Sequence, residues 1–94
     1  MATLIKPDGT ETQVHPANTS HGFTLEELYR HIGCGIVEMV RLADGREMWL
    51  DEEGKFNSAL APNERATILL VQAGGIPGDF VVGNVLVTDA GEVK

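Results

Sequence analysis

The fold class follows from residues 23–51, which read FTLEELYRHIGCGIVEMVRLADGREMWLD. Thr24 and Glu27 have the Thr-x-x-Glu spacing of a capping box, in which each side chain accepts a hydrogen bond from the other residue's backbone N–H. Gly33 follows the last apolar residue of the helical pattern, and glycine adopts the left-handed conformation of a C-cap without steric cost. This part of the sequence therefore predicts a helix between Thr24 and Gly33.

A β-hairpin is expected directly after this helix. Residues 36–42 and 47–51 are the two strands, and Asp44-Gly45 between them favours a two-residue type I′ turn. The first of these strands carries apolar side chains on both faces, which predicts an interior strand that is covered on two sides. Glu38 is the charged exception on one of those faces.

A second hairpin and a last strand are predicted at the two ends of the chain. Residues 2–5 and 10–15 are separated by a Pro-Asp-Gly turn, which is typical of two strands that pair as neighbours. Residues 80–88 are apolar at alternate positions of both faces and predict a strand. Gly83 interrupts it, which indicates a bulge or a close approach of two backbones.

A second helix is predicted from about residue 64 to residue 73. Asn63 can cap it, and its apolar residues cover a wide arc, so we expect it to be well buried. The order of elements is ββ-α-ββ-α-β. It predicts one compact α+β domain over residues 1–94, with a mostly antiparallel sheet and two short helices packed on it.

Composition narrows the class of function. The 94 residues are enough for one domain, and a formal charge of −7 argues against general nucleic-acid binding, which needs a basic face. No apolar run approaches the roughly 20 residues that span a membrane. The single cysteine, Cys34, fits a reducing compartment. We therefore expect a soluble cytoplasmic protein, and a homo-oligomer because association would enlarge the core of so small a domain.

Four short motifs follow one another in a characteristic order. They are Ile32–Glu38, Asp51–Lys55, Pro62–Arg65 and Gly83–Val87. In this order and spacing they resemble the family known as domain of unknown function 3846, over nearly the whole domain after the first hairpin. The chain differs from the family's pattern at Cys34, where that pattern has glycine, and at Asp51, where it has asparagine. The resemblance implies an origin in phages, plasmids or their bacterial hosts, and implies no established activity.

An enzyme is not expected. The sequence has no Gly-x-Ser-x-Gly nucleophile motif, no phosphate loop and no dinucleotide-binding fingerprint. The carboxylates of the Asp51–Lys55 loop suit calcium or magnesium but lack EF-hand spacing, so a solvated turn with Gly54 in the left-handed conformation is favoured. Cys34 follows the end of a helix, where the helix dipole opposes thiolate formation. We expect no catalytic residue, metal or cofactor.

Five residues form the predicted ligand site of a non-enzymatic binder. Lys55 and Arg65 flank the acidic loop and would clamp a phosphate or carboxylate. Trp49 would stack on a base, and Asn63 or Glu38 would bind polar edges of the ligand. Structural roles stay open beside these: cover for the core edge by Trp49, and a buried but paired carboxylate for Glu38. For the two cations the alternative is a pair of surface ion pairs with Glu52, Glu53 or Glu64.

Two functions are compatible with these features. The first is sequestration of a small ligand, with a nucleotide-derived immune signal in the host cytoplasm during phage infection as the specific hypothesis. Finding Lys55 and Arg65 both far apart and fully solvated would undermine this hypothesis. The second is a protein-interaction module that inhibits or regulates a host protein through an acidic surface and exposed strand edges.

Overall fold

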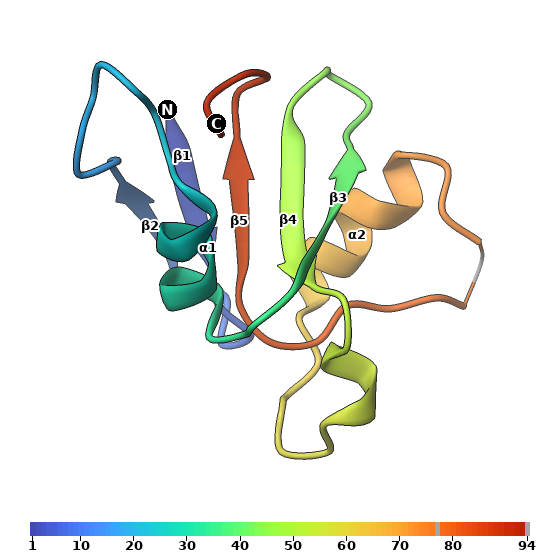
Figure 1. Cartoon of the computed structure of the whole chain (residues 1–94). Coiled ribbons are helices and arrows are strands. Elements are labelled where there is room, and N and C mark those ends of the chain that lie inside the picture. Colours follow the sequence, from blue (N-terminus) through green and yellow to red (C-terminus); the bar gives the residue numbers. More distant parts are fainter. Residues whose placement is uncertain (77, 94) are drawn as a thin grey trace.

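The computed structural model describes residues 1–76 and 78–93 and confirms the predicted α+β class. The elements in chain order are β1 (Ala2–Ile5), β2 (Glu11–Val14), α1 (Leu25–Ile32), β3 (Val37–Arg41), β4 (Glu47–Asp51), the 3-10 helix η1 (Gly54–Phe56), α2 (Glu64–Gln72) and β5 (Val85–Thr88). The five strands form one sheet in the order β2-β1-β5-β4-β3, and each neighbouring pair is antiparallel (Figure 1). Among the described residues, no helix has the length and apolar character needed to cross a membrane.

The last strand in the sequence occupies the centre of the sheet. β5 lies between the two hairpins and pairs with β1 on one side and β4 on the other. Leu86 of β5 is opposite Leu4 of β1 and opposite Trp49 of β4. The first hairpin is therefore an integral part of the central sheet, and all four residues of β5 are buried.

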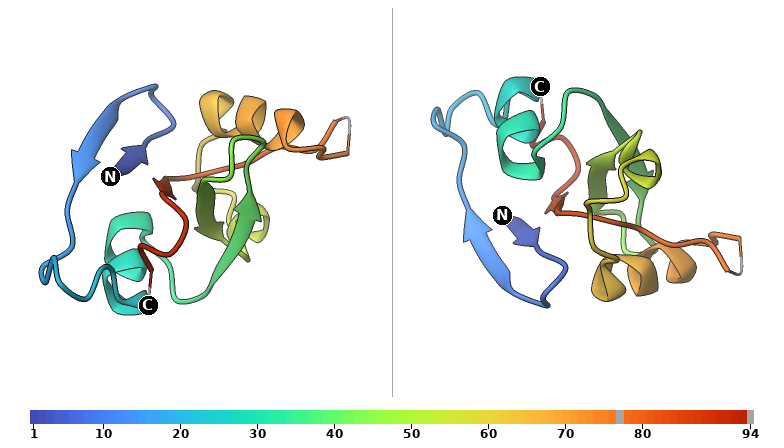
Figure 2. Two further views of the ribbon diagram at one scale, coloured as in Figure 1. Left: turned by 90° about the horizontal axis from the view of Figure 1, so that it is seen from above. Right: turned by 90° about the horizontal axis from the view of Figure 1, so that it is seen from below.

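The two helices cover opposite faces of the sheet (Figure 2). Side chains alternate between the faces of a strand, so β5 contributes to a core on each side. Leu86 packs with Leu28 of α1, whereas Val85 and Val87 belong to the core that contains Leu69 of α2. A five-stranded sheet with a helix on each face is thus held by two cores that share the same strands.

The cap structure of α1 is confirmed. The Thr24 hydroxyl accepts a hydrogen bond from the N–H of Glu27 at 3.2 Å, and the Glu27 carboxylate accepts one from the N–H of Thr24 at 3.0 Å. Gly33 ends the helix with a φ of +81°. The second carboxylate oxygen of Glu27 makes a further contact that the sequence does not predict. It accepts a hydrogen bond from the N–H of Ala17 at 2.8 Å. This contact fixes the preceding loop against the helix.

The prediction of an interior first strand in the second hairpin is wrong. β3 is an outer strand of the sheet, and Ile36 and Met39 remain 44% and 40% exposed. Apolar side chains on both faces describe how a strand is covered, but they carry no information on whether both of its edges are paired. The longer buried run of β5 takes the central place instead.

The predicted type I′ turn is also wrong. Asp44 does not have the positive φ that this turn requires, and the left-handed residue is Gly45, with a φ of +90°. Leu42 donates its N–H to the carbonyl of Arg46 at 2.8 Å, so three residues form the loop. The Pro-Asp-Gly turn of the first hairpin has the same hydrogen-bond pattern. In both loops the aspartate caps the N–H two residues later, which favours this longer loop.

The last strand and the second helix differ in part from their predictions. β5 begins at Val85, because Gly83 turns the chain with a φ of +74°. The predicted close approach of two backbones at Gly83 is confirmed, since its N–H donates to the carbonyl of Ala61 at 2.8 Å. A Cβ at this position would in addition lie 3.3 Å from Leu60 Cδ1. α2 is not well buried: Ile68 and Val71 are each 48% exposed. Only one side of this helix contacts the sheet, so its wide apolar arc exceeds the surface that can be covered.

Candidate functional site

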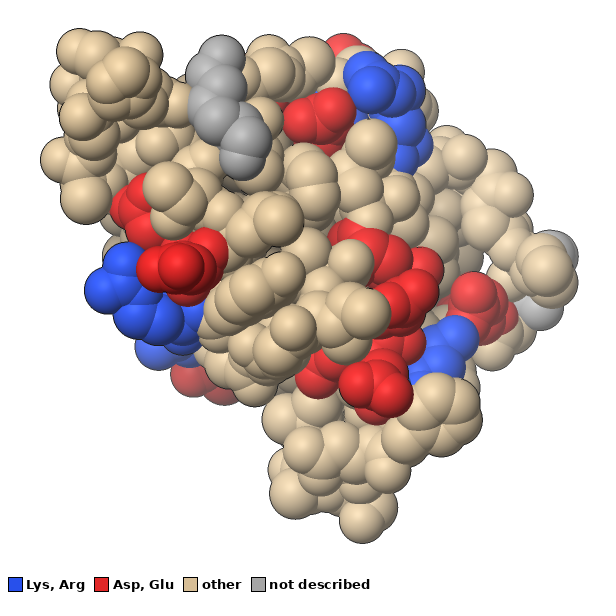
Figure 3. Space-filling view, viewed as in Figure 1, with Lys and Arg blue, Asp and Glu red and all other residues tan. Residues whose placement is uncertain are grey.

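The surface beside β3 has a shallow hollow of about 120 Å³, which we call the β3 hollow. It is lined by Glu38, Leu50, Asp51, Glu52, Lys55, Phe80, Val81 and Val82. Three carboxylates and one lysine thus surround an apolar floor. Figure 3 shows acidic side chains gathered over the ends of β3 and β4 nearest η1, with a basic side chain beside them. The predicted site residues Glu38 and Lys55 meet here.

Lys55 is held by its neighbours within the hollow. Its ammonium group forms an ion pair with Asp79 and lies 5.0 Å from the centre of the Phe80 ring. The hydrogen bond from Lys55, together with one from the N–H of Phe80, keeps the pKa of the Asp79 carboxyl below its usual value. Lys55 therefore forms a surface ion pair, as the structural alternative predicted, but its partner is Asp79 and none of the three glutamates expected for that role. The positive charge of Lys55 is largely compensated before any ligand arrives.

Glu38 is exposed at the outer edge of the sheet, so the prediction that it is buried is wrong. Its position follows from β3 being an edge strand. Glu38 and Glu52 have no ion-pair partner among residues 1–76 and 78–93. Asp51 accepts a hydrogen bond from the N–H of Glu53 at 2.9 Å, which leaves its charge uncompensated. The hollow therefore has an excess of negative charge.

Arg65 does not line the hollow. It extends from the first turn of α2 towards β2, where its Nε lies 4.0 Å from a carboxylate oxygen of Glu11. β2 and β3 are the opposite outer strands of the sheet. Lys55 therefore lies near the β3 edge of the sheet and Arg65 near the β2 edge. The predicted clamp of two cations is not formed within one chain.

Asn63 is completely buried and acts in the fold. Its Oδ1 accepts a hydrogen bond from the N–H of Ala66 at 3.0 Å, which confirms the predicted helix cap. Its Nδ2 donates to the carbonyl of Ile5 at 3.1 Å and to that of Gly83 at 2.8 Å. Both amide hydrogens and the amide oxygen are engaged, so this side chain has no surface to offer a ligand.

Trp49 lies on the other face of the sheet from the hollow. The register places Trp49 opposite Met39 and Leu50 opposite Glu38, so Trp49 and Glu38 point in opposite directions. Trp49 is half-buried against the core below α1, and its Nε1 donates a hydrogen bond to Thr88 at 3.1 Å. The predicted role as cover for the core edge is therefore confirmed.

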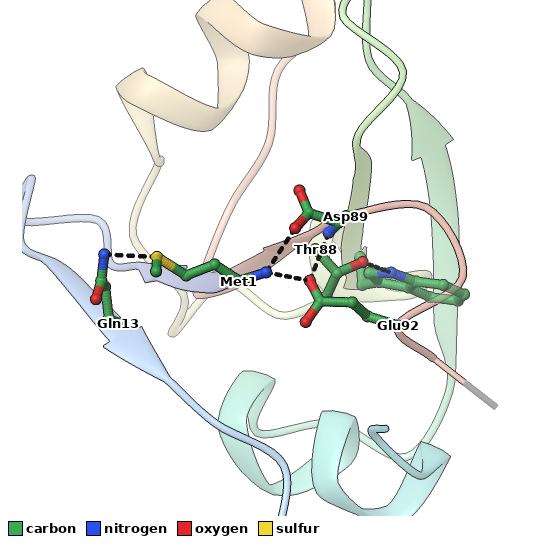
Figure 4. A network of polar contacts seen from close by, with 6 residues as sticks. Met1, Gln13, Thr88, Asp89 and Glu92 are labelled. Carbon is green, nitrogen blue, oxygen red and sulfur yellow. Dashed lines mark hydrogen bonds and ion pairs between the residues drawn. The ribbon is translucent and has the colours of Figure 1, made fainter. Parts of the chain in front are cut away.

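A second polar cluster follows β5 (Figure 4). The ammonium group of Met1 lies 2.6 Å from a carboxylate oxygen of Asp89 and 3.0 Å from one of Glu92. Hydrogen bonds to these two carboxylates raise the pKa of the ammonium group above its ordinary value. One ammonium group faces two carboxylates, so the cluster keeps one net negative charge. It ties the start of β1 to the segment after β5, next to Thr88.

Gly54 has a role that sequence reasoning assigned incorrectly. The prediction of a left-handed turn residue is wrong, because Gly54 lies buried at the start of η1 without a positive φ. A Cβ at Gly54 would lie 3.0 Å from a methyl carbon of Val82, so glycine is needed for the close approach of η1 to the wall of the hollow. The Glu-Glu-Gly-Lys motif does mark Gly54 as a special position. The sequence cannot show whether glycine is there for a close contact or for a left-handed turn.

The remaining candidates are a cysteine, a metal centre and a second hollow. Burial, with a smaller contribution from Asp51, raises the pKa of the Cys34 thiol, which does not favour a nucleophile. Within residues 1–76 and 78–93, no three histidine, cysteine or acidic side chains converge on a metal position. A hollow of about 130 Å³ lies between the β3–β4 turn and α2, and none of the five predicted site residues lines it.

Nearly the whole chain matches a known family model. The family is described as Domain of unknown function (DUF3846), and the match covers residues 1–93. It includes the first hairpin, which the four short motifs did not reach. Searches of curated proteins and of solved structures each found no match. The family description assigns no activity, so function has to be argued from the geometry of the β3 hollow and its surroundings.

Proposed function

The chain belongs to the family described as Domain of unknown function (DUF3846), and we propose that it is a non-enzymatic module that binds a partner protein. The binding surface is the acidic edge, which consists of β3 together with the carboxylates of Glu38, Asp51 and Glu52. The observation that carries the proposal is that these three carboxylates line a hollow directly beside an outer strand. Given the origin implied by the family resemblance, the partner is a host protein.

Charge and apolar surface both support this function. Three carboxylates face one lysine that already has Asp79 as its partner, and the whole chain carries a net charge of −7. Such a field attracts basic partners and speeds their encounter. Ile36 and Met39 are large apolar side chains with substantial exposure on the same edge, and they supply area that a partner can remove from water.

The experiment is a capture assay with the tagged protein in bacterial host lysate. The double variant Glu38→Lys with Glu52→Lys reverses two charges of the acidic edge. Glu26→Lys with Glu64→Lys is the matched control, since it makes the same change of net charge at exposed positions on the helices. We expect the control to retain a basic host protein and the first variant to lose it by roughly tenfold or more. Equal retention by both variants would show that this edge is not the binding surface.

Sequestration of a small ligand remains a second proposal, supported by the presence of Lys55 and Glu38 in one hollow. A volume of about 120 Å³ is below the roughly 300–1,000 Å³ of typical small-molecule sites. A nucleotide-derived immune signal would therefore need a site completed by another copy of the chain, as in the predicted homo-oligomer. Light scattering tests the association.

The ligand proposal has its own test. In a thermal-shift screen against cyclic dinucleotides and other nucleotides, a ligand at 100 times its Kd should stabilise the fold by about 2.7 kcal/mol. Recovery of that nucleotide intact would indicate sequestration. A flat screen would favour the protein-binding function.

A further inference from the structure

We propose that β3 receives an extended segment of the partner as an additional strand of the sheet, and that this segment alternates apolar and basic side chains. The inference rests on the proposed function and specifies how the acidic edge binds. It follows from three properties of β3: the direction of its free backbone groups, the side chains on its two faces, and the charge of the adjacent hollow.

Along β3, the backbone has a row of hydrogen-bonding groups that no other residue among 1–76 and 78–93 engages. Leu42 donates its N–H to Arg46, and the carbonyl of Ile36 accepts from Glu52, so the even-numbered residues of this strand face β4. Hydrogen bonding alternates along an antiparallel pair. The N–H and C=O groups of Val37, Met39 and Arg41 therefore point away from the sheet. They have the spacing that an added strand requires.

The two faces of β3 differ in chemistry. On the α1 face, Val37 and Met39 stand beside the half-buried Trp49, so an added strand meets apolar surface opposite these two residues. Arg41, at the end of the strand on this face, is paired with Glu47. On the α2 face, Glu38 stands at the rim of the β3 hollow. Residues paired across two strands lie on the same face. An added strand therefore fits β3 when its side chains on the α1 face are apolar and its side chains on the α2 face suit the β3 hollow.

The β3 hollow favours a basic side chain on the α2 face of the added strand. Its floor contains Leu50, Val81 and Val82, and its rim contains carboxylates. Lysine and arginine combine an aliphatic stem with a charged end, so the stem can cover the floor while the end reaches Glu38 or Glu52. A volume of about 120 Å³ is suited to one side chain rather than to a larger molecule.

The opposite edge of the sheet lacks these properties. The hydrogen bond from Lys6 to Thr10 sets the same alternation for the first hairpin, so Glu11 and Gln13 of β2 point their backbone groups outwards. These residues are exposed and polar, and Arg65 already lies beside Glu11. Hydrogen-bonding capacity is thus present at both edges, but a complementary surface occurs at β3. β2 therefore provides an internal control.

The first test uses defined peptides and titration calorimetry. The probe is acetyl-Thr-Lys-Val-Lys-Val-Lys-Thr-amide, and its matched control has glutamate in place of lysine. A second pair carries N-methyl groups either on both valines or on two of the lysines. We take the added strand to be antiparallel to β3, as every neighbouring pair in this sheet is. In that orientation the valines opposite Val37 and Met39 turn their N–H groups towards β3, and the lysine N–H groups face away. We expect methylation of the valines to weaken binding by at least about tenfold and methylation of the lysines to change it little.

The second test changes the protein. Met39→Pro removes an outward N–H and costs no hydrogen bond within the sheet, as proline is tolerated on outer strands. Gln13→Pro makes the same change on β2. We expect Met39→Pro and Glu38→Lys to abolish binding of the lysine probe, and Gln13→Pro to preserve it. Circular dichroism and thermal unfolding establish that each variant is folded. Amide exchange should slow at Val37, Met39 and Arg41 when the probe binds.

The outcomes separate the two proposals. Loss of binding in Glu38→Lys with no effect of Met39→Pro or of valine methylation would overturn strand addition and leave the acidic edge as the binding surface. Insensitivity to all of these changes would overturn both. Absence of binding by the lysine probe, or equal binding by the glutamate probe, would also overturn the proposed alternation of apolar and basic side chains.

Discussion

Asn63 joins three parts of the molecule through one buried amide: the start of α2, the end of β1 and the turn at Gly83. Asn63→Ala removes the helix cap and the two hydrogen bonds that Nδ2 donates to buried carbonyls. We expect a loss of roughly 2–4 kcal/mol in the free energy of unfolding, from the cap and these two hydrogen bonds together. Urea denaturation measures it.

Asn63→Asp is the informative comparison. Aspartate keeps an oxygen for the N–H of Ala66 but presents a second oxygen to the carbonyls of Ile5 and Gly83, which are acceptors as well. It should therefore be at least as destabilising as alanine, although aspartate is as good a helix cap as asparagine. A stability close to that of the unsubstituted protein would show that the contacts of Nδ2 contribute little.

The hydrogen bonds of Glu27 should make the stability of the fold depend on pH. Its carboxylate accepts hydrogen bonds from the N–H groups of Ala17 and Thr24, and these hold its pKa below the ordinary value of 4.5. A carboxyl whose pKa is lower in the folded state stabilises the fold above its unfolded pKa, and the contribution is lost as pH falls through the folded value. Glu27→Gln should therefore be less stable than the unsubstituted protein at pH 7.

The difference in stability between Glu27→Gln and the unsubstituted protein should narrow below about pH 4.5 and be smaller still at pH 3. Chemical denaturation of both proteins across this range measures it, and other carboxyls cancel in the comparison. A difference that stays constant with pH would mean that Glu27 acts without its charge.

At the scale of elements, β3 should show an alternating pattern of amide exchange. Glu38 and Val40 donate their N–H groups towards β4, whereas those of Val37, Met39 and Arg41 point to solvent. We expect the second set to exchange at least about tenfold faster in the free protein, because no hydrogen bond has to open first. Two-dimensional NMR after transfer into D₂O resolves the two sets. Uniform protection along β3 would mean that another chain already covers this edge.

Elements whose signals are local could be predicted from the sequence. The capping box of Thr24 and Glu27, the cap of Asn63 and the glycine after α1 each act within a few residues. The position of β3 could not be predicted, because it depends on which strand pairs with which edge. The central place of β5 is set by pairing with β1, whose residues lie 80 to 84 positions earlier in the sequence.

The candidate site was predictable only in part. Lys55 and Glu38 do lie in one hollow, but Asp79 and Phe80, which hold Lys55, follow it by more than 20 residues and have no motif. Arg65 and Lys55 flank one loop in the sequence, which predicts that they lie together. Sequence proximity was misleading here, since the side chain of Arg65 turns towards β2.

For the molecule as a whole, the two cores should melt together. Leu28 fills the core below α1 and Leu69 the core below α2, yet both cores are built on the same strands. Leu28→Ala and Leu69→Ala should each cost roughly 2–5 kcal/mol and lower one shared unfolding transition. Calorimetry, with near- and far-ultraviolet circular dichroism as separate probes, tests this. Two transitions in either variant would mean that the faces unfold independently.

The central position of β5 affects the order in which the chain can mature on a ribosome. Both hairpins are synthesised before residues 85–88, and each can form early because its contacts are local. Until β5 emerges from the exit tunnel, the inner edges of β1 and β4 have no partner and are open to pairing with other nascent chains. The sheet therefore closes late in synthesis. Before it closes, the unpaired edges of β1 and β4 are the surfaces that a chaperone would have to shield.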